Sequence, residues 1–186
     1  MENEQPAIQL VPVAYEDKSI LRRLGELYCY DFSEFTGDDL NAHGEYGCLD
    51  YLDHYWTEKN RDPFFIKVGG KLAGFVLVRH LNESSPDSLG ETVGHTIAEF
   101  FVMRKYRRQG VGQTVAWQVF DRFPGRWSVD ELATNLPAIL FWRKVIDAYT
   151  GGSYRELRHA GGRPVQVFTA PPTRAADHSP TRQHDP

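Results

Sequence analysis

The sequence predicts one α/β domain built around a mixed β-sheet. The 186-residue chain is 41% apolar and 25% charged, which is the composition of an ordinary globular domain. Short β-type runs fill much of its first half, and strand and helix patterns alternate in its second half. Such an alternation implies a parallel crossover that packs helices against a sheet. We expect about six or seven strands and four helices over residues 1–170, and a disordered, proline-rich tail over residues 171–186.

The first half begins with a β-type run at residues 7–13. Apolar residues then recur between Ile20 and Tyr28 as on one face of an amphipathic helix. Residues 31–47, rich in acidic residues, glycine and aromatics, are predicted to be irregular, and a short helix follows over 49–56. The runs 64–68 and 72–81 flank Gly69 and Gly70, and this predicts a hairpin because glycine tolerates the positive φ of tight turns.

The second half is predicted to alternate strands with helices. A polar loop containing Pro86 and Gly90 leads to a long strand at 92–103. A helical period follows over 111–123, then a strand at 127–132 and a well-buried helix at 136–149. The chain closes with a hairpin over 154–168 that turns at Gly161 and Gly162.

Charge and cysteine usage exclude several classes of protein. The net charge is −4, which weighs against a nucleic-acid-binding or anionic-membrane-binding surface, and no apolar run reaches the 18 residues of a membrane span. The acidic start of the chain lacks a secretory signal, so we predict a cytoplasmic location. Cys29 and Cys48 stand outside any ligand-spaced cluster, which predicts free thiols and no metal site.

The clearest chemical signal lies where the strand at 92–103 turns into the helix that starts near 111. The first backbone N–H groups of a helix have no partners within the helix, and the helix dipole makes that end positive. Gly110 and Gly112 would let a ligand approach the backbone, and Arg107 and Arg108 add formal charge. This combination predicts a phosphate or pyrophosphate site. It matches neither the P-loop nor the dinucleotide fingerprint.

Arg107-x-x-Gly110-x-Gly112 resembles the R/Q-x-x-G-x-G/A signature of the GNAT superfamily of N-acetyltransferases. The segment from Asn135 to Lys144 similarly resembles the family pattern N-x-x-A-x-x-F-Y-x-K. The motif-bearing resemblance covers residues 92–150, and the element order fits over 7–169. It implies a GNAT-like fold whose sheet splays open between the strands at 92–103 and 127–132, with acetyl-CoA lying in the opening.

The resemblance also implies which residues meet the cofactor. The pantetheine arm would bond to backbone along the first splayed strand, the pyrophosphate would meet the glycine-containing loop, and two residues would line the far wall. These cofactor-binding residues are Phe101, Val102, Met103, Arg107, Arg108, Gln109, Gly110, Val111, Gly112, Gln113, Thr114, Asn135 and Trp142.

An amine acceptor requires a base, because an amine with a pKa of about 10.4 is neutral in only about 1 part in 2,500 at pH 7. Glu99 is the first candidate, since burial in its apolar strand would raise its pKa; the alternative is a structural carboxylate. His95 is the second, on the same sheet face by alternation; the alternative is a hydrogen-bonded surface histidine. Trp142 stands where the resemblance implies a tyrosine that acts as the general acid for the leaving thiolate. Tyr149 lies farther along that helix, and packing alone would explain it.

Residues 28–56 combine seven acidic side chains with many aromatic ones and contain no lysine or arginine. Acids and aromatic rings hold cations by ion pairing and cation–π contact, which predicts a small cationic amine as acceptor. The predicted acceptor-binding residues are Asp31, Glu34, Asp38 and Tyr46. The alternative is a solvated acidic loop with its aromatics packed on the core.

We therefore expect an acetyl-CoA-dependent N-acetyltransferase, acting as a monomer or homodimer by direct attack in a ternary complex. A catalytically weak acyl-CoA-binding sensor is the competing function, because Trp142 stands where the family's tyrosine would be. A modifier of nucleic acid or the ribosome is the third, and only the basic cluster of Arg104, Lys105, Arg107 and Arg108 supports it.

Overall fold

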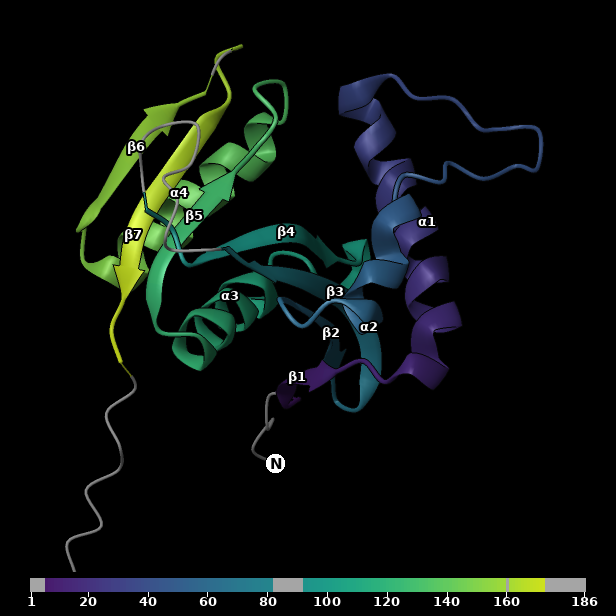
Figure 1. The fold of residues 1–186 in the computed structure, drawn as a ribbon, viewed down its shortest axis with the longest axis horizontal. Helices are drawn as coiled ribbons and strands as arrows, with labels where there is room; N and C mark the ends of the chain where they lie inside the picture. Colours follow the sequence, from purple (N-terminus) through teal and green to yellow (C-terminus); the bar gives the residue numbers. More distant parts are fainter. Residues whose placement is uncertain (1–5, 82–91, 160, 173–186) are drawn as a thin grey trace, which may run out of the picture.

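The computed structural model describes residues 6–81, 92–159 and 161–172, and it confirms the predicted element order (Figure 1). Seven strands form one sheet in the order β1-β2-β3-β4-β5-β7-β6. The strands are β1 (Ile8–Pro12), β2 (Arg61–Val68), β3 (Lys71–His80), β4 (His95–Val102), β5 (Gly125–Asp130), β6 (Tyr154–Arg158) and β7 (Pro164–Ala170). The α-helices are α1 (Lys18–Thr36), α2 (His54–Thr57), α3 (Val111–Arg122) and α4 (Leu136–Thr150). Three short 3-10 helices are η1 (Tyr15–Asp17), η2 (Asp50–Asp53) and η3 (Arg104–Tyr106).

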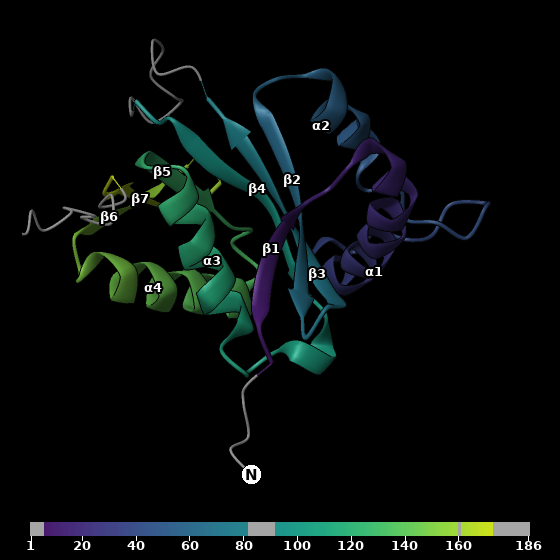
Figure 2. The ribbon, with the colours of Figure 1, turned by 90° about the horizontal axis from the view of Figure 1, so that it is seen from below.

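Two helical layers enclose the sheet, with α1 and α2 on one face and α3 and α4 on the other (Figure 2). Each face has its own apolar core. Phe75 and Leu77 are fully buried on the α1 side, and Phe120 and Trp127 are fully buried on the α3 side. Within the described residues, no helix is long and apolar enough to cross a membrane.

The sheet opens between β4 and β5, as the family resemblance implies. These two strands are parallel, but only His95 with Trp127 and Thr96 with Ser128 form paired positions. The rest of β4, through Val102, pairs with β3 alone. The N-terminal end of β4 therefore closes the base of this opening, and its C-terminal end leads into η3 and α3 at the open side.

A β-bulge in β4 overturns the prediction that His95 and Glu99 share a face. Leu77 pairs with Glu99 but the adjacent Val78 pairs with Ile97, so one extra residue, Ala98, interrupts the alternation. Ile97 consequently packs in the core on the α3 side, whereas Ala98 packs on the α1 side. The bulge turns Glu99 toward α1.

Helix α1 is longer than predicted, because residues 31–36, expected to be irregular, are helical. Phe32 and Phe35 follow Tyr28 at i+4 and i+7, which continues the apolar face of the helix. The helix ends at Gly37, whose φ of 75° and N–H bond to Ser33 O form a left-handed C-cap.

The prediction of two free thiols is wrong, because Cys29 and Cys48 form a disulfide. Cys29 is buried in α1 and Cys48 is exposed in the segment before η2, and the two lie 19 positions apart in the sequence. Their Cα atoms are 5.9 Å apart, a separation that a disulfide spans readily. The disulfide removes the free-thiol argument for a cytoplasmic location.

Some predicted features lie outside the described residues. The loop with Pro86 and Gly90 is one of them, and the tail predicted at 171–186 is described only at 171 and 172.

Candidate active site

Glu99 stands on β4 beside the opening, held between two tyrosines from the α1 layer. The Tyr28 hydroxyl on α1 donates to Glu99 Oε2 at 2.5 Å, and the Tyr51 hydroxyl on η2 donates to Oε1. The rings of Phe75 and Phe101 pack edge-on against Tyr28. The Glu99 carboxylate, in largely apolar surroundings, therefore has two neutral hydrogen-bond donors.

Burial is the largest influence on this carboxyl group and raises the pKa of Glu99. The bonds from Tyr28 and Tyr51 act in the opposite direction because they stabilise the carboxylate, while the negative charge of Asp130 on β5 raises the pKa further. Burial and the charge of Glu99 also raise the pKa of both phenols, so Tyr28 and Tyr51 remain protonated donors. The group has the elevated pKa that suits a general base.

The glycine-containing loop and the start of α3 form the open end of the site. Gly110 is the N-cap of α3 with a φ of 79°, and no atom lies within 4 Å of where a Cβ would stand. Arg108 also has a positive φ, of 60°. The chain at Gly110 therefore borders open space just before the first N–H groups of α3, which have no partners within the helix, an arrangement that suits an anionic group such as a pyrophosphate.

Gly112 has a packing role that the sequence did not predict. A Cβ at this position would stand 3.0–3.1 Å from the ring of Phe141 on α4. This glycine lets α3 and α4 approach each other, whereas Gly110 faces open space.

Asn135 and Trp142, predicted to line the far wall, have structural contacts. Asn135 is the N-cap of α4, and its Oδ1 accepts the N–H of Ala138 at 3.1 Å. Trp142 is buried among aromatic rings, including Phe100 at 5.0 Å and Phe141 at 5.0 Å. Tyr149 donates to Asp121 Oδ1 at 2.8 Å, which directs its hydroxyl to α3.

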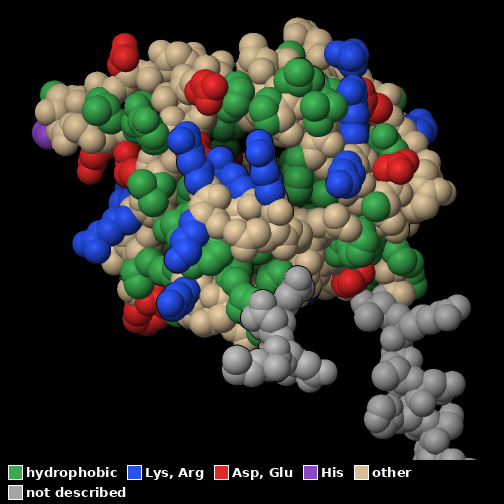
Figure 3. Space-filling model, turned by 180° about the vertical axis from the view of Figure 1, so that it is seen from behind, with side chains coloured by type: hydrophobic (Ala, Val, Ile, Leu, Met, Phe, Trp, Pro, Cys, Tyr) green, Lys and Arg blue, Asp and Glu red, His purple; other side chains and the backbone are tan. Residues whose placement is uncertain are grey.

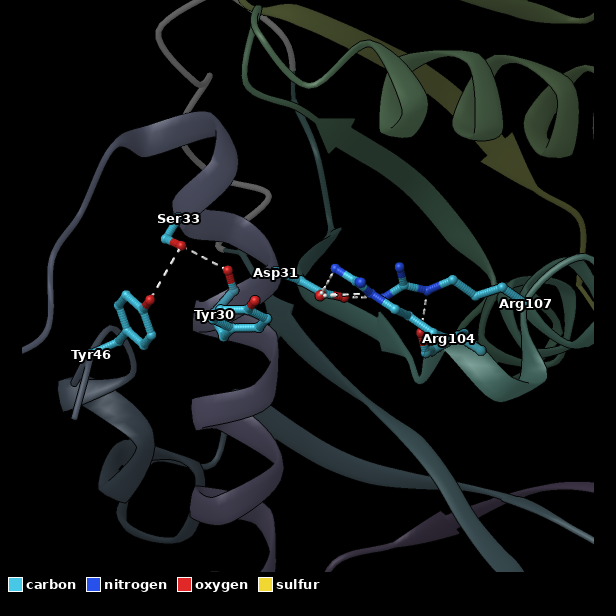
Figure 4. A network of polar contacts seen from close by, with 7 residues as sticks. Tyr30, Asp31, Ser33, Tyr46, Arg104 and Arg107 are labelled. Atoms are coloured by element: carbon cyan, nitrogen blue, oxygen red, sulfur yellow. Dashed lines mark hydrogen bonds and ion pairs between the residues drawn. The ribbon is translucent and has the colours of Figure 1, made fainter. Parts of the chain in front are cut away.

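Asp31, predicted to bind the acceptor, instead forms ion pairs with Arg104 and Arg107 (Figure 4). Arg107 also donates through Nε to the carbonyl of Val102 at 2.6 Å. Val102 is the last residue of β4, the part of the strand where the pantetheine arm is predicted to form hydrogen bonds. Because strand groups alternate in direction and the N–H of Met103 bonds to Ala73 on β3, the N–H of Val102 points toward the opening.

The other predicted acceptor residues do not converge on Glu99. Asp38 accepts from Thr36 Oγ1 at 2.6 Å and is exposed, and Glu34 is exposed one turn before it. Tyr46 packs against Tyr30 on the side of α1 away from Asp31 (Figure 4). The structure thus favours solvated acidic side chains, with Glu34 on the last turns of α1 and Asp38 in the loop that follows it.

Glu26, which the sequence analysis did not single out, anchors this loop to α1. Its carboxylate accepts the backbone N–H groups of Tyr46 and Gly47, at 2.7 and 3.1 Å. The Cys29–Cys48 disulfide ties the loop down next to this point. Both attachments lie just before η2, which carries Tyr51.

His95 lies at the closed base of the opening, on the α3 face. Its Nδ1 is 2.8 Å from Nδ1 of His80, whose Nε2 is 2.6 Å from Asp62 Oδ2, and its Nε2 is 3.3 Å from the Pro124 carbonyl. This position favours the alternative of a hydrogen-bonded histidine. In the described part of the chain, no group of three or more His, Cys, Asp or Glu residues is arranged to hold a metal ion.

Glu131 is a second buried acid, and it lies beneath α4. It follows β5 and accepts from Gln166 Nε2 at 3.4 Å, while Gln166 also donates to Glu156, the ion-pair partner of Arg143. Burial is the main reason that the pKa of Glu131 is raised to about 8. Nothing in the local sequence pattern indicates this network, because its four members come from α4, β6, β7 and the segment that follows β5.

Lys and Arg side chains gather near the middle of the face seen in Figure 3. In the sequence, Arg104, Lys105, Arg107 and Arg108 are concentrated between β4 and α3. A basic surface at a helix N-terminus attracts phosphates.

The comparisons with known proteins agree with this arrangement. The family model of the acetyltransferase (GNAT) family matches residues 26–146. The chain belongs to this family. The matched segment of this GNAT protein includes the C-terminal part of α1, the opening between β4 and β5, the glycine-containing loop and most of α4. A search of curated proteins finds no match.

Solved structures share the fold at low sequence identity. An acetyltransferase from Thermus thermophilus has a TM-score of 0.65 and 14% identity, over 88% of this chain and 97% of that chain. Aminoglycoside acetyltransferase AAC(6')-Ib, in complex with coenzyme A, has a TM-score of 0.59 and 15% identity, over 88% and 95%. Spermidine N-acetyltransferase from Vibrio cholerae, in complex with CoA and spermine, has a TM-score of 0.59 and 10% identity, over 88% and 95%.

Proposed function

We propose that this protein transfers an acetyl group from acetyl-CoA to a primary amine of a small cationic acceptor, with Glu99 as the general base. The observation that carries the proposal is the position of Glu99. It lies beyond the last paired positions of β4 and β5, partly buried, and bonded to two phenols rather than to a cation. A carboxylate without a cationic partner in these contacts can receive a proton from an incoming ammonium group.

The chain supplies groups for both substrates. The Val102 N–H, the first amides of α3 and Arg108 would hold acetyl-CoA, whose thioester supplies the acetyl group. Glu99 accepts a proton from the acceptor ammonium. The neutral nitrogen then attacks the thioester carbonyl, the C–N bond forms as the C–S bond breaks, and CoA leaves as the thiolate. The nitrogen loses its second proton to water as the amide forms, the thiolate takes up a proton from water, and Glu99 returns its proton to solvent. We assign no dedicated acid, because Trp142 is buried and an indole N–H is not acidic enough.

The surroundings of Glu99 support a cationic acceptor. Glu99 itself supplies the negative charge, since Asp130 on β5, whose charge also acts on Glu99, forms an ion pair with Arg163. Tyr28, Phe32 and Phe101 provide aromatic faces on the α1 side, with ring centroids 5.1 to 6.0 Å apart. The similar structures named as spermidine and aminoglycoside acetyltransferases point to the same class of amine.

The test is amine-dependent release of CoA thiol from acetyl-CoA, without added reductant, across monoamines, diamines, polyamines, amino sugars and basic amino-acid derivatives. At least one amine should accelerate the release. Glu99→Gln should lower kcat/KM for that amine by roughly 10²- to 10⁴-fold and leave the Kd for acetyl-CoA unchanged. Glu131→Gln is the matched control, since it removes another buried carboxyl from beneath α4 and should retain activity.

Two results would contradict the proposal. Full activity of Glu99→Gln would show that Glu99 is not the general base. Tight acetyl-CoA binding with no release for any amine would instead support the sensor function.

A further inference from the structure

We propose that Asp31 is a positioning residue for acetyl-CoA binding, acting through Arg104 and Arg107 rather than by touching either substrate. The inference rests on the proposed function, because it concerns the same cofactor loop. It replaces the prediction that Asp31 binds the acceptor.

Asp31 joins α1 to the segment that follows β4. Arg104 donates to Asp31 Oδ1 through Nε and Nη2, at 3.1 and 2.8 Å, and Arg107 Nη2 donates to Oδ2 (Figure 4). The Asp31 side chain is only 18% exposed, whereas that of Arg104 is 69% exposed. One carboxylate thus orients two guanidinium groups whose charges would otherwise repel each other.

Arg107 passes this constraint on to β4. Its Nε donates to the Val102 carbonyl at 2.6 Å, and its guanidinium carbon lies 5.7 Å from the centre of the Phe101 ring. Arg107 is therefore held from both ends, by a side chain of α1 and by the last residue of β4. Arg108, Gln109 and Gly110 follow it directly, so the geometry of the loop depends on where Arg107 is held.

Two physical effects of removing Asp31 have opposite signs. The carboxylate offsets one of the two positive charges of Arg104 and Arg107, so its loss leaves a more positive site. Electrostatics alone would then bind the anionic acetyl-CoA more tightly. The ion pairs of Asp31 with Arg104 and Arg107 also act as a clamp on the cofactor loop. Loss of this clamp would free both arginines, disorder the chain before the loop, and weaken acetyl-CoA binding.

The test is calorimetric titration of Asp31→Asn with acetyl-CoA. We expect the Kd to rise about tenfold, the size of one lost charge-assisted contact, while kcat at saturating acetyl-CoA and the KM for the amine stay near wild type. Glu16→Gln, an equal change of charge at an exposed residue in η1, controls for net charge and should leave the Kd unchanged. Thermal melting followed by circular dichroism checks that each variant is folded.

A double-mutant cycle separates the clamp from a general structural effect. Arg107→Lys keeps the charge but lacks the two-sided geometry of a guanidinium. If Asp31 acts through Arg107, the double variant should bind acetyl-CoA about as weakly as either single variant. Additive losses would overturn the inference.

The remaining outcomes are also decisive. Tighter acetyl-CoA binding by Asp31→Asn would show that charge dominates and would overturn the clamp. An unchanged Kd with a raised KM for the amine would return Asp31 to the acceptor site. Absence of acetyl-CoA binding by the wild-type protein would defeat the proposed function itself.

Discussion

Replacing Tyr28 by Phe should shift the acid limb of the pH–rate profile to higher pH. Tyr28 donates a 2.5 Å bond to Glu99, and this bond stabilises the carboxylate against the effect of burial. Without it, the pKa of Glu99 rises further. The base must be ionised to accept a proton, so activity on the acid side is lost at a higher pH than in the wild type.

The size of the shift follows from the energy of the bond. A hydrogen bond to a charged group contributes about 1.5–3 kcal/mol, and one pKa unit corresponds to about 1.4 kcal/mol. The acid limb of kcat/KM should therefore move up by about 1 to 2 pH units. Tyr51→Phe should give a shift of the same sign, since its hydroxyl bonds to the other oxygen.

The assay is kcat/KM for the best amine between pH 5 and 10, measured at fixed ionic strength. Tyr149→Phe is the control, because its hydroxyl bonds to Asp121 and not to Glu99. An acid limb that stays in place in both Tyr28→Phe and Tyr51→Phe, or that moves to lower pH, would refute Glu99 as a base whose ionisation the phenols control.

Three stability predictions follow from other parts of the fold. Between pH 4.5 and about 8 the folded protein keeps a proton on Glu131 that the unfolded chain releases, so the free energy of unfolding falls as the pH rises. Glu131→Gln should remove this loss. It should raise the free energy of unfolding above pH 8 by up to about 5 kcal/mol relative to wild type and change it little near pH 4.5. The same difference in stability between variant and wild type at both pH values would contradict this. Serine at Cys29 and Cys48, or treatment with a dithiol, should lower the free energy of unfolding by about 3 kcal/mol in denaturant titrations, and an unchanged midpoint would argue against the disulfide. Gly74→Ala would place a Cβ 1.9 Å from the Phe101 carbonyl oxygen, so it should cost about 3 kcal/mol in the same titrations, and wild-type stability would refute that close approach.

Local patterns in the sequence predicted most of the fold. Hydrophobic period identifies α3 and α4, and the glycine pair identifies the β2–β3 hairpin, because these signals act within a few residues of chain. The sequence pattern ends helix α1 too early, because Asp31 and Glu34 resemble loop residues. The carboxylate of Asp31 forms ion pairs with Arg104 and Arg107, which lie much later in the sequence, so no local pattern explains an acidic residue at this position of the helix.

The site needed long-range contacts that no short pattern encodes. The bulge at Ala98, which turns Glu99 toward α1, depends on register with β3. The Cys29–Cys48 pair has a separation that carries no metal-site or disulfide signature. Tyr28 was the one available clue, since a phenol on the buried stripe of a helix requires a hydrogen-bond partner.

The most direct test of the account is calorimetric titration of the purified wild-type chain with acetyl-CoA. The geometry of Gly110, α3 and the opening between β4 and β5 predicts one site per chain with micromolar affinity. Binding should weaken with added salt, be competed by CoA and be unaffected by DNA. A titration without heat of binding, confirmed by equilibrium dialysis, would contradict the assignment of this opening as an acetyl-CoA site.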